Sequence, residues 1–132
     1  MPKGTAMMTH LYNALVAVTD LDRSLAFYTG TLGWEKRDDM PMGDERWLTV
    51  GIPGAQTALA LGAGMMAADL TPGGNTGITV VTSDLDGDYA RLKAAGVEFT
   101  EPIQTMPWGD RATWFKDPDG NLFFFIGGST AT

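Results

Sequence analysis

The chain contains no cysteine and only one histidine, His10, among its 132 residues. The lack of cysteine excludes disulfide bonds and thiolate metal sites, and it fits a reducing compartment. Positive charge is scarce as well, since nine Lys and Arg stand against sixteen Asp and Glu, for a net charge of −7. This acidic balance argues against nucleic acid or an anionic membrane as a partner.

Long hydrophobic runs are also missing. The apolar stretch at residues 11–18 is too short to span a bilayer, and it leads directly into Asp20 and Asp22. We therefore expect no signal peptide, no membrane partner and a cytoplasmic protein. The length and the hydrophobic content of 44% are typical of a single globular domain with a buried core.

What the sequence does contain is an internal repeat. Residues 17–22, Ala-Val-Thr-Asp-Leu-Asp, are echoed by residues 81–86, Val-Thr-Ser-Asp-Leu-Asp, at an offset close to half the chain. A repeat of this size indicates two supersecondary units that bury their apolar faces together.

The first unit reads as a strand, a helix and three more strands. The strand at 11–18 precedes a helix that Asp20 caps and Gly33 ends, with apolar residues at helical spacing between them. The three strands that follow are expected at residues 34–38, 46–50 and 57–61.

The second unit repeats this order after a linker rich in Gly and Pro at residues 63–75. A strand at 77–81 leads to a helix that begins at Ser83 or Asp84 and stops at Gly96. Further strands are expected at residues 97–100, 111–116 and 122–126. The chain is thus predicted to be one domain, residues 11–127, with modules at about 11–62 and 76–127.

Three segments carry a resemblance to a known family. Residues 19–28 followed by Leu32-Gly33 resemble the opening of vicinal oxygen chelate proteins, the superfamily of glyoxalase I, extradiol dioxygenases and bleomycin resistance proteins. Residues 92–97 resemble the end of its second helix, and residues 117–121 resemble the turn before its last strand. The resemblance implies an α+β fold of two βαβββ modules that form a cupped mixed β-sheet, with helices on the convex side. The open edges of such a cup lead us to expect a homodimer.

The resemblance also locates the metal site of the family's enzymes, whose ligands are His and Glu. The matching positions here are Asn13, Gly77 and Phe124, and a fourth falls near residues 59–60. One amide oxygen is a poor ligand set, so we expect no metal and no other cofactor. His10 lies three positions before Asn13, which predicts a solvent-side residue ahead of the first strand.

Alternation along the strands predicts which side chains face the ligand. Counted from the positions that the resemblance matches, alternation puts residues of three strands on the concave face of the implied cup: Asn13, Leu15, Ala17, Gly77, Thr79, Val81, Leu122, Phe124 and Ile126. The resemblance to fosfomycin-resistance proteins, which have a ligand-facing aromatic at this position, adds Trp114, with Ala112 beside it. The sequence does not determine which way Trp47 faces.

The loop at residues 106–111 is a second candidate for ligand contact. Its Trp108-Gly109-Asp110-Arg111 sequence resembles a loop of mitomycin-binding proteins. A tryptophan at a loop tip is costly to leave in water, so Trp108 is expected to cover a ligand or a partner chain. Arg111 is counted with it as a ligand-binding residue.

An apolar, aromatic cup predicts metal-independent binding of a small apolar or aromatic molecule, such as an antibiotic or natural product that the protein sequesters. The alternative is an enzyme of the same family that works without a protein-bound metal, such as a cyclase, isomerase or lyase. A metal-dependent glyoxalase-like lyase or dioxygenase comes third. The sequence shows no nucleophile–base arrangement and no phosphate-binding loop.

Overall fold

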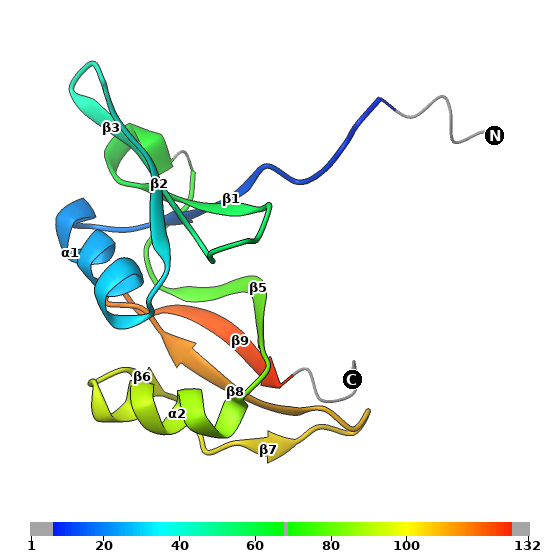
Figure 1. Cartoon of the computed structure of the whole chain (residues 1–132). Helices are drawn as coiled ribbons and strands as arrows, with labels where there is room; N and C mark the ends of the chain where they lie inside the picture. Colours follow the sequence, from blue (N-terminus) through cyan, green and yellow to red (C-terminus); the bar gives the residue numbers. More distant parts are fainter. Residues whose placement is uncertain (1–6, 68, 128–132) are drawn as a thin grey trace.

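The computed structural model describes residues 7–67 and 69–127. These residues form two halves, each with its own sheet and its own main helix (Figure 1). The elements of the first half are β1 (Asn13–Ala17), α1 (Leu21–Leu25), the π-helical segment η2 (Ala26–Thr31), β2 (Glu35–Met42), β3 (Glu45–Gly51) and β4 (Ala58–Gly62). The short 3₁₀ helix η3 (Gly64–Ala67) follows β4 and packs on β1, β3 and β4 of the first half. The elements of the second half are β5 (Gly74–Thr82), α2 (Leu85–Ala94), β6 (Glu98–Phe99), β7 (Gln104–Thr105), β8 (Arg111–Lys116) and β9 (Asn121–Gly127).

The two sheets have corresponding topologies. The first has the order β1-β4-β3-β2 and the second the order β5-β9-β8-β6, with β7 also paired to β8. In each sheet the first strand runs parallel to the last strand of its half, and the other pairs are antiparallel. The predicted α+β class and the repeated order of elements are confirmed.

The structure differs from the predicted single cup in one respect. Among the described residues no strand of one half pairs with a strand of the other, so there are two sheets. Side chains at the start of β9 and in the turn before it bind the backbone at the end of β1. Asn121 Nδ2 donates to the Ala17 carbonyl at 2.9 Å, and Asp119 accepts from the Thr19 amide at 3.2 Å. β5 also begins earlier than predicted, because Gly74, inside the expected linker, pairs with Asn121.

Both helices begin where an aspartate can cap them. The Asp20 carboxylate accepts from the Arg23 amide at 3.1 Å, and the Asp84 carboxylate accepts from the Gly87 amide at 3.0 Å. Of the two residues that the sequence allowed for the second helix, Asp84 is therefore the cap. The first helix widens to a π-helix that ends at Thr31, and Gly33 follows its cap Leu32 with a φ of 83°, in the left-handed region that favours glycine.

One continuous core joins the halves, and Tyr28 is at its centre. The Tyr28 ring is fully buried in η2 and contacts Trp34 of its own half, with ring centroids 5.4 Å apart. It also meets Phe123 of β9 edge to face at 6.2 Å. The helix of the first half therefore packs against the sheet of the second.

A buried carboxylate also links the two halves. Asp117, only 5% exposed, accepts four hydrogen bonds. Its Oδ2 takes the Tyr28 hydroxyl and the Asn121 side-chain amide, both at 2.8 Å. Its Oδ1 takes the backbone amides of Asp119 and Asn121, both at 2.9 Å. A carboxylate removed from water is stable only with partners of this kind.

We expect Tyr28→Phe to lower the free energy of unfolding by about 1.5 to 3 kcal/mol, because the substitution takes a hydrogen bond from a buried carboxylate. Urea denaturation measures the difference. Tyr89→Phe is the matched control, since the Tyr89 hydroxyl accepts only a long, exposed contact of 3.4 Å from Lys93. Equal stability of wild type and Tyr28→Phe would show that the bond does not hold the halves together.

The same tyrosine predicts a loss of stability in alkali. Burial and the neighbouring Asp117 carboxylate raise the pKa of Tyr28 well above its ordinary value of 10.0. Above about pH 10 the unfolded chain releases the Tyr28 proton while the folded chain keeps it, so stability falls by up to about 1.4 kcal/mol per pH unit. Unfolding measured at several alkaline pH values should show a shallower decline in Tyr28→Phe than in wild type.

Candidate functional site

The outer face of the second sheet carries aromatic side chains that the core does not use. Phe115, Phe123 and Phe125 are buried, and strand alternation places their neighbours Trp114 and Phe124 on the opposite face. Trp114 and Phe124 are cross-strand partners, and their ring centroids lie 4.7 Å apart.

Trp108 extends this pair from the loop before β8. Its ring meets Phe124 edge to face, with centroids 6.5 Å apart, and the residue is 63% exposed. The indole N–H donates to Asp110 Oδ2 at 2.9 Å, and the Met106 amide donates to the Asp110 carbonyl at 2.7 Å. Trp108, Trp114 and Phe124 together are called the aromatic face below. The contact with Asp110 is a positioning role that the sequence did not indicate, because adjacent loop charges are usually solvated.

Two predicted residues of the same strand do not take part in this face. Arg111 lies on the side of α2, where its guanidinium pairs with both carboxylate oxygens of Asp86 at 2.6 and 2.9 Å. These bonds lower the pKa of Asp86. Ala112 shares the side of Trp114 but has no exposed surface.

Residues of the first sheet also divide between two faces. Ala14 and Val16 pack in the core, so Asn13 and Leu15 face away from it, as alternation predicted. The structure settles the direction of Trp47 in the same way. Its neighbour Leu48 is fully buried in the core, which places Trp47 on the outer face.

Thr79 lies at the join between the halves. It is the cross-strand partner of Phe124 and is exposed. It also lines a cavity of about 190 Å³ together with Ala58, the cross-strand partner of Asn13. The structure therefore brings Thr79 next to both the aromatic face and the edge of the first sheet.

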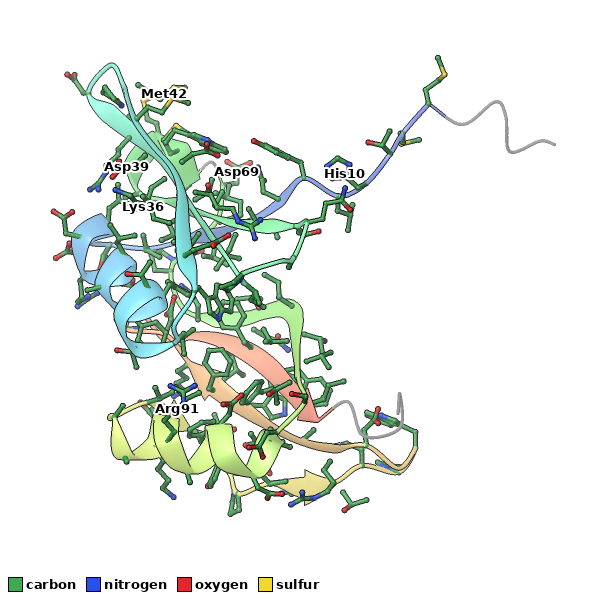
Figure 2. The ribbon with its side chains drawn as sticks, viewed as in Figure 1. His10, Lys36, Asp39, Met42, Asp69 and Arg91 are labelled. Carbon is green, nitrogen blue, oxygen red and sulfur yellow. The ribbon has the colours of Figure 1, made fainter. Side chains whose placement is uncertain are left out.

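The described residues contain no group of three or more His, Asp or Glu placed to hold a metal ion. Of the positions that the resemblance assigned to ligands, Gly77 and Phe124 offer no ligand atom and Leu59 is in the core. His10 is exposed on the segment before β1, away from the sheets (Figure 2), and its Nδ1 lies 2.8 Å from Thr9 Oγ1. These residues do not fit the divalent metal of the family's enzymes.

The described part of the chain has no helix that is long and apolar enough to cross a membrane.

Comparison with known families agrees with the doubled fold. The sequence profile of the Glyoxalase/Bleomycin resistance protein/Dioxygenase superfamily matches residues 9–125. The chain belongs to this superfamily.

Individual proteins also resemble the chain along most of its length. The uncharacterized protein YetH of Bacillus subtilis (strain 168) is 33% identical over 125 residues, which are 89% of this chain and 97% of YetH. A superfamily member of known structure from Sphaerobacter thermophilus DSM 20745 is 46% identical with a TM-score of 0.88, covering 92% of this chain and 99% of that one. TnmS3, an antibiotic binding protein from Streptomyces sp. CB03234, is 33% identical with a TM-score of 0.83, covering 92% and 98%.

Proposed function

We propose that the aromatic face binds a flat, largely apolar small molecule without a metal ion. The observation that carries this proposal is the cluster of Trp108, Trp114 and Phe124 outside the core, with Trp108 exposed at its edge. The likeness to TnmS3, an antibiotic binding protein, supports an antibiotic or a related natural product as the ligand. Sequestering such a molecule would make this a resistance protein.

The chemistry of the face suits binding by burial and stacking. Each aromatic contact contributes roughly 0.5–1.5 kcal/mol beyond the burial of apolar area, and micromolar affinity needs about 8 kcal/mol in total. Two stacking contacts plus the burial of one planar ring system reach that range. Trp114 and Phe124 are on paired strands, so their rings are held in place before any ligand arrives.

We further propose that a second copy of the chain covers the outer faces. Apolar side chains are exposed on both halves: Tyr12 before β1 is 62% exposed, and Val81 on the outer side of β5 is 59% exposed. Exposed apolar surface of this kind, beside the open edge strands β1 and β5, marks an interaction surface. A symmetric dimer is its commonest solution.

Trp114→Ala should weaken the binding of a water-soluble anthraquinone about tenfold or more, because a loss of about 1.4 kcal/mol of stacking corresponds to tenfold in affinity. Quenching of tryptophan fluorescence by the anthraquinone measures the affinity. Trp108→Ala should mainly raise the dissociation rate, since an edge residue acts by retaining the ligand. Binding should persist in the presence of a chelator.

Tyr89→Leu is the control for that experiment. Tyr89 is a half-buried aromatic residue of α2 that packs against Phe99 with tilted rings, away from the aromatic face, and its loss should leave the affinity unchanged. Tight anthraquinone binding that survives both Trp114→Ala and Phe124→Ala would place the ligand elsewhere. Chemical conversion of a bound natural product would favour the metal-free enzyme instead.

Light scattering at micromolar concentration should give twice the chain mass of 14.1 kDa. Val81→Glu should shift this equilibrium toward the single chain, because it would bury a charge in the contact. Lys93→Gln, on the exposed side of α2, is the control, because it also lowers the net charge by one. A mass of one chain for the wild-type protein contradicts the dimer.

A further inference from the structure

A cavity of about 200 Å³ lies between the two halves, on the side of the second sheet opposite the aromatic face. Its lining includes Phe115 and Phe125, which alternate along their strands with Trp114 and Phe124. Because neighbouring residues of a strand point to opposite faces, the sheet separates the wall made by Phe115 and Phe125 from the aromatic face. At its margin the cavity also touches Val81, on the exposed edge strand β5.

Both halves contribute apolar walls. Leu92 of α2 and Val80 of β5 come from the second half, and Trp34 and Ile52 come from the first. The first half supplies these walls at the end of its helix and at the end of β3. The cavity therefore exists only because of how the halves pack against each other.

An arginine holds one of these walls in place. Arg37 Nη2 donates to the carbonyls of Ile52 and Ala55, both at 2.7 Å. Gly51 makes room for this guanidinium, since a Cβ at that position would overlap it. The loop at 52–57 is thereby fixed beside the cavity without any ligand, so binding there requires little ordering of the chain.

The mouth of the cavity is polar and has no net charge. Asp88 and Arg91 of α2 pair at 3.3 Å, and Thr82 Oγ donates to Asp88 Oδ2 at 2.6 Å. Arg91 also reaches the Thr31 carbonyl at 3.4 Å, and it projects from α2 toward the end of the first half's helix (Figure 2). Both contacts of Arg91 are long, which leaves its guanidinium able to donate to a further acceptor.

We infer that this cavity is a second binding site, for a neutral aromatic alcohol with one ring, such as a simple phenol. An apolar cavity of about 150 Å³ holds benzene, so the volume here suits one ring with a short substituent. A hydroxyl group can donate to Asp88 and accept from Arg91 at once. A carboxylate would face Asp88 and an ammonium group would face Arg91, so charged heads are disfavoured.

Fluorine NMR of protein labelled with fluorotryptophan tests this site directly, because the four tryptophans report on different places. Trp34 lines the cavity, whereas Trp108 and Trp114 belong to the aromatic face. Single Trp→Phe variants assign the signals. Addition of para-ethylphenol should shift the Trp34 signal with saturation at a dissociation constant of about 1 mM or below, which is ordinary for so small a molecule.

Two comparisons, one between ligands and one between variants, test whether the residues at the mouth of the cavity bind the hydroxyl group of the ligand. Ethylbenzene and para-ethylbenzoate should bind at least about fivefold more weakly than para-ethylphenol, because the first makes no hydrogen bond and the second adds a charge. Arg91→Met should weaken para-ethylphenol binding to a similar extent. Lys93→Met is the matched control, since Lys93 is two positions along the same helix and does not line the cavity.

The outcomes separate this site from the proposed function, on which it does not rest. Trp34 also lines the cavity beside Thr79, so a saturable shift of Trp34 supports the second site only when Trp108 and Trp114 stay unmoved and Arg91→Met weakens the binding. Shifts confined to Trp108 and Trp114 overturn it while leaving the aromatic face as the ligand site. An unmoved Trp34 signal overturns it too. Equal affinities for ethylbenzene and para-ethylphenol, or equal losses in Arg91→Met and Lys93→Met, overturn the assignment of the head group to the mouth.

Discussion

The buried Asp117 carboxylate is the contact on which the arrangement of the two halves depends. A charge in the core is tolerated only when hydrogen bonds replace water, and here they come from Tyr28 of the first half and from the turn that starts β9. These hydrogen bonds therefore dock the helix of the first half on the second sheet. They also fix the register of β9 after the turn.

The register of β9 determines which side chains the second sheet presents on each of its faces. Three consecutive phenylalanines begin at Phe123, and alternation sends the first and third into the core and Phe124 outward. Trp114 and Phe115 divide in the same way on β8. Packing on the inner side holds the backbone beneath the outer side, so the aromatic face is rigid without being buried.

Membership in the superfamily explains the architecture of the chain, but the chemistry of its surfaces depends on particular residues. Without a set of metal ligands among the described residues, the outer face can act through burial, stacking and a few hydrogen bonds. The same packing of halves that positions this face also leaves the cavity beside Trp34, whose mouth is lined by the Asp88–Arg91 pair. Two surfaces of different chemistry thus arise from one pair of docked modules.

Much of the fold was predictable from the sequence because its signals are local. Aspartate caps, the glycine after the first helix and strand alternation act over a few residues, and they predicted where both helices begin and how side chains alternate along β1, β8 and β9. The assignment of Asn13, Trp114 and Phe124 to a concave, ligand-facing surface stays a prediction. Contacts between distant segments were not predictable. Arg111 pairs with Asp86, which is 25 positions away in the sequence. This pairing directs the Arg111 side chain toward α2, although the loop motif had assigned it to the ligand. The separation into two sheets, the direction of Trp47 and the cavity between the halves likewise came only from tertiary packing, because each depends on which surfaces meet when the modules dock.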